Sequence, residues 1–191
     1  MKAGWMKSWL CVSAIVAIVA ATASALPQGK KAVPKRNELT LHGIRPGKDT
    51  ISEVRKRTFG KKLWQMSARE WLGGDPCGVL ELRIETDEGG LIESVDIGGP
   101  STAIISECRL KIDYGAWVSG RGLHLHDEIA RVIEIYGEPG SRGPSVKNGQ
   151  ELELLYYAFD WAGSDVPQVM EVSCDKESGR VVEIMLAFPS L

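Results

Sequence analysis

Residues 43–60 read GIRPGKDTISEVRKRTFG, and residues 122–139 read GLHLHDEIARVIEIYGEP. Each stretch opens with glycine and an apolar residue and runs through an extended segment to an acidic or hydroxyl residue. A short amphipathic helix follows and ends at glycine. The same order of signals at two places predicts two copies of one structural unit. We assign the first unit to residues 39–118 and the second to residues 119–191.

Each copy contains one predicted helix. Thr50 and Glu53 have the spacing of a capping box, which predicts a first helix over residues 50–59. Asp127 is the predicted cap of the second helix. The apolar face of that second helix, at positions i, i+3, i+4 and i+7, consists of Ile129, Val132, Ile133 and Tyr136.

Strand signals follow each helix. Residues 79–86 alternate apolar and charged side chains, a DEGG turn follows, and residues 91–97 return, which predicts a hairpin. Residues 62–72 occupy the place of a preceding strand. In the second unit the predicted strands are 152–159, 169–174 and 180–186. The expected fold class is therefore α+β, with two tandem units that each pack a short helix on one face of antiparallel strands.

The order Gly-Ile-x-Pro-Gly, capped helix, x-Gly-x-Pro and three antiparallel strands resembles the SmpA/OmlA-type small outer-membrane lipoproteins, and the tandem arrangement resembles the β-lactamase inhibitor protein. Residues 119–139 and the strand-turn-strand 169–186 carry the match most strongly. The resemblance implies a two-layer fold and binding of a protein through the concave sheet face. The chain departs from the pattern at His126, which stands where the first unit has Gly47, and at Gly60-Lys61, which lacks the counterpart of Pro139. It also has no lipobox, which argues against a membrane-tethered assembly role.

The N-terminus predicts export. Lys2 and Lys7 precede an apolar run over residues 10–23, and Ala23-Ser24-Ala25 is the small-x-small pattern of a cleavage site. The run is 14 residues long, short of the ~20 that a membrane-spanning helix needs. We interpret residues 1–25 as a signal peptide and residues 26–38 as a flexible basic tail, so the protein is expected in the periplasm or the external medium.

Charge is unevenly distributed along the chain. The formal net charge is −2, but residues 30–62 hold eleven Lys and Arg against three acidic residues, and residues 63–191 hold ten against twenty-two. One interpretation is a basic segment that contacts an anionic membrane surface or partner. The other is that this segment lies against the chain's own acidic surface. Nucleic acid is not an expected partner, because the basic stretch lacks interleaved aromatic residues.

Three cysteines remain after signal cleavage, so at most one pair can close within the chain. Cys77 with Cys108 is the preferred disulfide, because Cys77 enters a strand and Cys108 follows the strand that returns beside it. Cys174 is then a free thiol, and its alternation with Met170 and Val172 predicts a buried position.

Two histidines raise the question of chemistry. His124 and His126 alternate, so both would leave one face of an extended segment, with Asp127 adjacent. Imidazole and carboxylate groups are ligands for divalent metals. No third ligand is fixed by spacing and Asp127 is needed as a helix cap, so no cofactor or metal is expected. Paired acids on strands, such as Glu81 with Glu85 and Glu151 with Glu153, are interpreted as a solvated face.

The aromatic residues after the second helix suggest binding. Tyr157 and Phe159 share one face of a strand, Tyr156 points to the other, and Trp161 follows. An exposed aromatic group of this kind anchors protein partners, whereas a buried one forms core. The leading hypothesis is a non-enzymatic protein-binding module that uses these four residues. The alternatives are an enzyme or metal binder centred on His124 and His126, and a structural envelope protein held by its basic tail.

Overall fold

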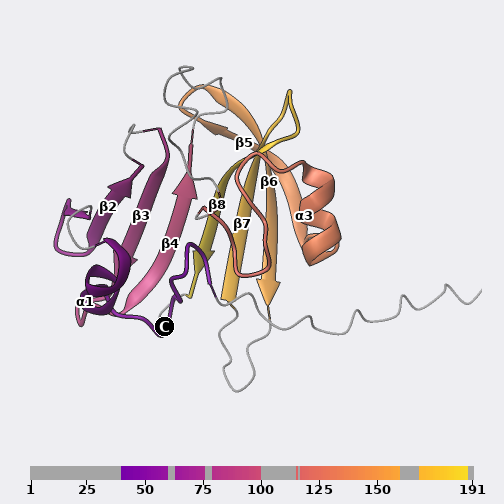
Figure 1. The fold of residues 1–191 in the computed structure, drawn as a ribbon. Helices are drawn as coiled ribbons and strands as arrows, with labels where there is room; N and C mark the ends of the chain where they lie inside the picture. Colours follow the sequence, from indigo (N-terminus) through magenta and orange to yellow (C-terminus); the bar gives the residue numbers. More distant parts are fainter. Residues whose placement is uncertain are drawn as a thin grey trace, which may run out of the picture. The chain divides into compact units, whose positions relative to one another are not determined.

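The computed structural model describes residues 40–59, 63–75, 79–99, 115, 117–159 and 168–188, all within the compact unit Val33–Leu191. These residues form one eight-stranded antiparallel sheet with the order β1-β2-β3-β4-β8-β7-β6-β5 (Figure 1). The strands are β1 Trp64–Gln65, β2 Glu70–Gly74, β3 Glu81–Thr86, β4 Ile92–Gly98, β5 Ser141–Lys147, β6 Gln150–Phe159, β7 Gln168–Asp175 and β8 Val181–Ala187. The helices are α1 Ile51–Val54, which continues as a π-helical turn over Arg55–Phe59, and α3 Ile129–Tyr136. In this described part of the chain, no helix has the length and apolar character to cross a membrane.

The predicted α+β fold of two tandem helix-on-strand units is wrong. The strands form one continuous sheet, and the described part of the protein is predominantly β with two short helices. The two halves of the sheet join where β4 pairs with β8, from Ser94↔Ala187 to Gly98↔Glu183. Each of these strands would otherwise present unpaired backbone N–H and C=O groups, and their pairing satisfies both.

The two similar sequence stretches make the same backbone hydrogen bonds. The first residue of α1, Ile51, donates to the oxygen of Gly90 at 2.9 Å, and the first residue of α3, Ile129, donates to that of Gly179 at 3.0 Å. Both glycines occupy the turn before the last strand of their half and have positive φ, 81° and 67°, which glycine adopts without strain. In each half, therefore, the helix begins against the turn between two strands.

The helix caps differ from each other. The capping box of α1 is confirmed: the Glu53 N–H donates to Thr50 Oγ1, and the Thr50 N–H donates to Glu53 Oε2 at 2.9 Å. The predicted cap of α3 is wrong, because the N-cap is Glu128, whose side chain makes no cap hydrogen bond. Asp127 instead accepts the backbone N–H of His124 at 2.9 Å, so its carboxylate closes the preceding turn and is not available to the helix.

The sequence located five strands to within two residues, and these predictions are confirmed for β3, β4, β6, β7 and β8. The segment 62–72 differs, because it contains β1, a turn and the start of β2. Edge strand β5 is an element that was not predicted. Its signal was Asn148-Gly149, where both residues have positive φ, 52° and 79°, as a two-residue hairpin turn requires.

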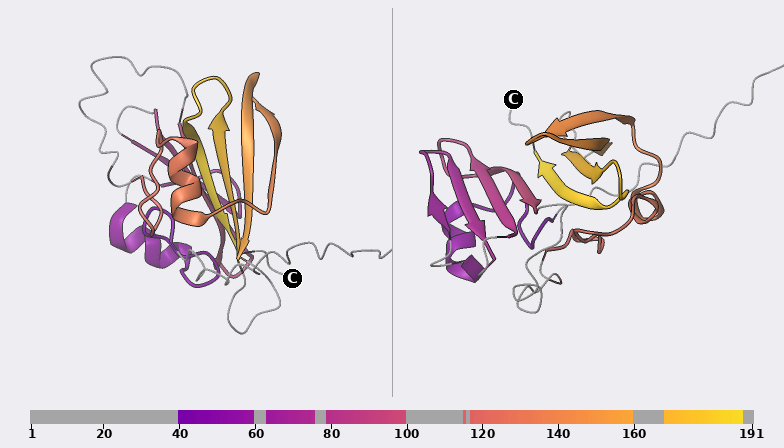
Figure 2. Two further views of the ribbon diagram at one scale, coloured as in Figure 1. Left: turned by 90° about the vertical axis from the view of Figure 1, so that its right-hand side faces the viewer. Right: turned by 90° about the horizontal axis from the view of Figure 1, so that it is seen from above.

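The core lies between one face of the sheet and the two helices (Figure 2). Alternate strand residues such as Leu82, Ile84 and Ile184 are fully buried there, and α3 adds Val132 and Tyr136. The Tyr136 hydroxyl forms a buried hydrogen bond of 2.7 Å with Ser119, so its polar group is satisfied. Both helices therefore cover the same face of the sheet, and neither covers the other face.

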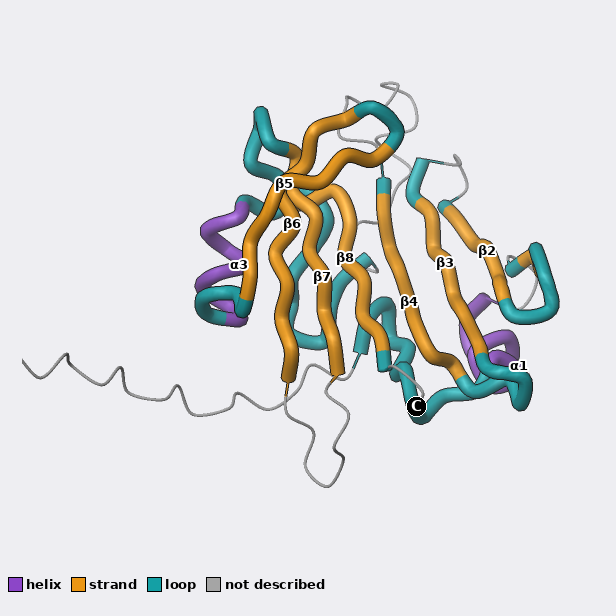
Figure 3. Tube along the Cα trace, turned by 180° about the vertical axis from the view of Figure 1, so that it is seen from behind, coloured by secondary structure: helices purple, strands orange, loops and turns teal. Residues whose placement is uncertain are grey.

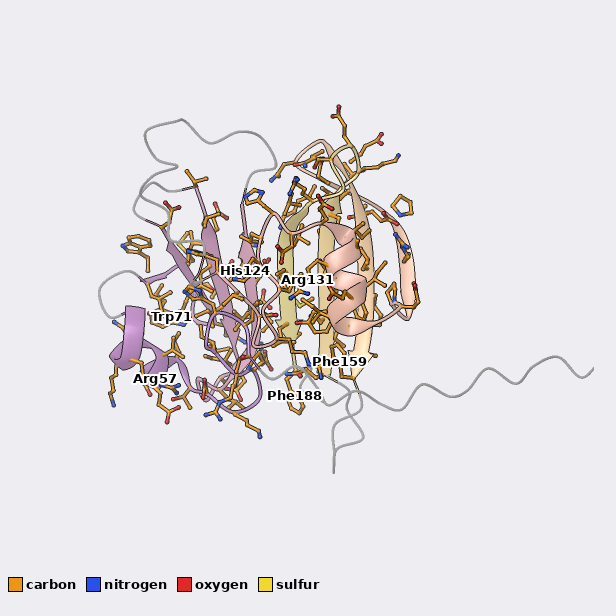
Figure 4. All side chains as sticks on the ribbon, turned by 45° about the vertical axis from the view of Figure 1, so that its right-hand side comes forward. Arg57, Trp71, His124, Arg131, Phe159 and Phe188 are labelled. Carbon is orange, nitrogen blue, oxygen red and sulfur yellow. The ribbon has the colours of Figure 1, made fainter. Side chains whose placement is uncertain are left out.

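Gly47 allows the C-terminal segment to pack on the first loop. Its φ is +75°, and a Cβ there would lie 2.6 Å from Cδ1 of Phe188. The side chain of Phe188 is labelled in Figure 4. Phe188 is also fixed by its backbone N–H, which donates to the backbone oxygen of Glu93 at 2.7 Å.

We predict that Gly47→Ala is more destabilising than Gly43→Ala. Both glycines have positive φ, but nothing lies within 4 Å of a Cβ at Gly43. Backbone strain alone would cost about 1–2 kcal/mol, and the clash with Phe188 would add about 1–3 kcal/mol. Urea denaturation measures both variants. In a Phe188→Ala background the two costs should become equal, and a persisting difference would contradict the assigned clash.

Candidate functional site

The sheet face that points away from the helices is a candidate binding surface. We call it the open face, and Figure 3 views the sheet from this side. On β3 the side chains of Glu81, Arg83 and Glu85 are exposed, while the alternate residues are buried. The strand register carries this exposed set across the sheet: Arg83 pairs with Leu72 on β2 and Asp96 on β4. Side chains from neighbouring strands therefore form one surface.

The open face is acidic. Register and alternation place two cations on it, Arg83 and Lys147, against a larger set of carboxyl groups. These are Glu70, Glu81, Glu85, Asp96, Glu171 and Glu183. Arg83 forms an ion pair with Glu70, with 3.5 Å between Nε and Oε1. The excess of carboxyl groups favours a cationic partner surface over an anionic one.

An apolar patch lies at the β1 edge of the open face. Trp64 is 58% exposed and pairs with half-buried Leu72, while Met66, next after β1, is 60% exposed. We call these three residues the Trp64 patch. Exposed aromatic and methionine side chains are typical anchors of protein interfaces. Trp71, only seven residues later, has the opposite role: it is buried, and the Arg55 guanidinium lies 4.9 Å from its ring centroid.

A carboxyl pair lies at the centre of the open face. Asp96 on β4 is hydrogen-bonded to Glu183 on β8. Glu183 also accepts hydrogen bonds from Lys147 Nζ and, at 3.4 Å, from the Ser173 hydroxyl. Burial, the hydrogen bond and the negative charge of Glu183 raise the pKa of Asp96 to about 8. The pKa of Glu183 is lowered despite its burial, because Asp96 and Lys147 donate to it.

Two of the four residues of the predicted aromatic site are buried. Tyr157 and Phe159 are 4% and 7% exposed and belong to the core, with their rings 5.7 and 6.1 Å from that of Tyr136. They lie on the helix-covered face, so α3 and not a partner contacts them. Tyr156 points to the open face and is half-buried. Trp161 lies outside the described residues.

The two histidines have different surroundings. His124 Nδ1 lies 3.8 Å from Asp127 Oδ2, and His126 has φ +70° with its N–H bonded to Val181 O at 2.7 Å. Among the residues that the structure describes, no three His, Cys, Asp or Glu side chains are placed to hold a metal ion.

The other residues that the sequence singled out lie in the core, in ion pairs or outside the described residues. Cys174 is a free, fully buried thiol whose pKa burial raises to about 12, which confirms the predicted buried position. The proposed disulfide of Cys77 with Cys108 lies outside the described residues. Within the basic segment, Arg45 and Arg57 each contact the buried carboxylate of Asp49 at 3.2 Å. This pair of arginines is thus neutralised partly within the chain.

Sequence reasoning missed the residues that mark the open face. Asp96 and Glu183 each stand between apolar residues of a strand, in SVDIG and VVEIM. That interruption was the available signal, but their proximity depends on the β4–β8 pairing between residues 87 positions apart. Trp64 lay in the segment whose strand pattern was least regular.

Comparison with known proteins adds little. The sequence matches no protein-family model and no curated protein. A crystal structure of an extracellular protein containing a SCP domain from Bacillus anthracis str. Ames is similar with a TM-score of 0.41 and 8% identity. The similarity covers 85% of this chain and 50% of that one, so this chain spans half the length of that protein.

We predict that the two tryptophans differ sharply in their contribution to stability. Trp71→Ala should lower the free energy of unfolding by about 3–5 kcal/mol, because a buried ring is lost. Trp64→Ala should change it by less than about 0.5 kcal/mol, as expected for a surface substitution. Guanidinium denaturation tests both variants. Equal losses would mean that Trp64 is packed in the fold and is not available to a partner.

Proposed function

We propose that this protein is a non-enzymatic binding module, acting outside the cytoplasm, that captures a protein partner on the open face of β1–β4. The observation that carries the proposal is the Trp64 patch, an exposed aromatic and apolar group on an acidic sheet face away from the helices. The expected signal peptide at residues 1–25 supports the location.

The physical reason for the proposal is the free energy that burial of an exposed apolar side chain would contribute. A large apolar side chain in water gives up the roughly 25 cal/mol per Å² that burial would contribute. Trp64 leaves more than half of its side chain exposed, although the core on the other face has accommodated Trp71. Burial of Trp64 by a partner recovers this energy, and aromatic residues dominate the binding energy of protein interfaces for the same reason.

The charges around the patch support a cationic partner surface. Glu70 and Glu85 face each other across β2 and β3. Among the paired residues of the described strands, Arg83 is the cation that lies between them and Asp96. A partner that presents Lys or Arg around an apolar pocket matches this pattern. Electrostatic attraction of this kind increases the association rate and weakens as salt screens it.

The test is a cross-linked pull-down from cell envelope and medium with the exported chain as bait. The native chain should capture one predominant protein, and Trp64→Ala should lower its recovery about 30-fold, the equivalent of a 2 kcal/mol hot spot. Val146→Ala is the matched control, because Val146 is 70% exposed but lies on the opposite edge strand. It should leave capture unchanged.

A second variant separates charge from apolar contact. Glu70→Lys with Glu85→Lys should slow association and remove its salt dependence while Trp64 remains in place. The proposal fails if no protein is captured, or if Trp64→Ala and Val146→Ala capture the same protein equally.

A further inference from the structure

The β4–β8 pairing is the place where the two halves of the sheet meet, and two acidic residues face each other there. Asp96 is paired with Met185, and Glu183 with Gly98, so the two carboxyl groups are diagonal neighbours on the open face. Diagonal pairs on one sheet face lie within reach of long side chains. The register therefore places the two carboxyl groups near each other, and the Glu183 side chain is long enough to reach Asp96.

A hydrogen bond between two carboxyl groups needs one proton. Asp96 is the donor, because Glu183 already accepts from Lys147 and Ser173. Lys147 comes from edge strand β5, three strands from β8 in the sheet order. Strands are spaced about 4.8 Å apart, so this contact requires the β5–β6 hairpin to curl back over the open face, as Figure 2 shows.

We propose that Asp96 and Glu183 share one proton across the β4–β8 pairing, and that loss of this proton loosens the joint between the two halves of the sheet. The inference does not depend on the proposed partner. It concerns a pH-sensitive element within the fold itself.

The charges that face Asp96 explain why the proton is retained at neutral pH. Arg83 on β3 and Lys147 on β5 favour ionisation, whereas burial and Glu183 on β8 oppose it. Glu81 on β3 and Glu171 on β7 add negative charge to the same face. The acidic groups and burial prevail, and the pKa of Asp96 is about 8.

The sign of the pH effect follows from the direction of that shift. Because the folded pKa of Asp96 is above its ordinary value of 3.8, the protonated pair contributes stability that is fully present below about pH 4. This contribution declines as the pH rises and is lost above about pH 8. Two carboxylates then face each other with the cations only partly compensating them.

The β4–β8 pairing should weaken without separation of the two halves of the sheet. On the helix side, the His42 N–H donates to Val118 O and the Gly120 N–H donates to Thr40 O, each at 3.0 Å. These bonds connect the two halves independently of the carboxyl pair. Loss of the proton is therefore expected to affect β4 and β8 and to leave β6 and β7 intact.

Carbon-13 NMR of the side-chain carboxyl groups tests the shared proton in the unmodified protein. One aspartate carboxyl should titrate near pH 8, and titration of every Asp and Glu carboxyl below pH 6 would overturn the proposal. In Lys147→Gln that titration should move to higher pH, because a cation that favours ionisation is removed. An unchanged midpoint would remove Lys147 from the pair.

Asp96→Asn tests the effect on the joint. The amide donates to Glu183 at every pH, so the difference in Tm between Asp96→Asn and the native chain should grow from pH 5 to 8 and level off above pH 9. At pH 9, amide exchange over Ile92–Gly98 and Val181–Ala187 should be faster in the native chain than in the variant, and equal over β6. Glu85→Gln, an exposed carboxylate on the same face, should follow the native pH profile. Equal pH profiles and exchange rates for Asp96→Asn and the native protein would overturn the proposal.

Discussion

The pairing of β4 with β8 is the interaction on which the rest of the structure depends. Five residue pairs, from Ser94↔Ala187 to Gly98↔Glu183, turn two four-stranded halves into one sheet. Because side chains alternate along each strand, this single register also decides which residues meet. It aligns Val95 with Leu186 and Ile97 with Ile184 in the core, and it brings Asp96 and Glu183 together on the opposite face. Core packing and surface chemistry are therefore two consequences of one alignment.

The two faces of the sheet differ in composition and in role. The helix-covered face contains the large aliphatic side chains and the aromatic group of Tyr136, Tyr157 and Phe159, whose burial stabilises the fold. The open face contains many carboxyl groups, and its buried apolar residues, such as Leu152 and Val169, lie outside the core that the helices cover. Its exposed tryptophan is an exception to this division. A surface with an aromatic anchor among acidic groups is suited to recognition, and this is why the proposed function is placed there.

The open face is also uneven. Over β1–β4 it presents Trp64 and its acidic neighbours, whereas over β5–β8 the sheet curls so far that Lys147 reaches Glu183 (Figure 2). This curl buries Leu152 and Val169 on the side away from the helices. The carboxyl pair lies at the boundary between these two regions, where repulsion between like charges would act on the one pairing that joins them.

Local elements could be predicted from residue order, because they depend on neighbours in the chain. These are the capping box of Thr50 and Glu53, the glycines at turns and the alternation in β3, β4, β6, β7 and β8. How the elements combine could not be predicted in the same way, because it depends on contacts between distant parts of the chain. Whether Tyr157 or Tyr156 faces the core depends on which side of the sheet α3 covers, and alternation cannot specify that side. The same holds for the single sheet and for the Asp96–Glu183 contact. Both arise from a pairing between distant strands, for which backbone hydrogen bonding provides the energy but leaves no signal in the local sequence.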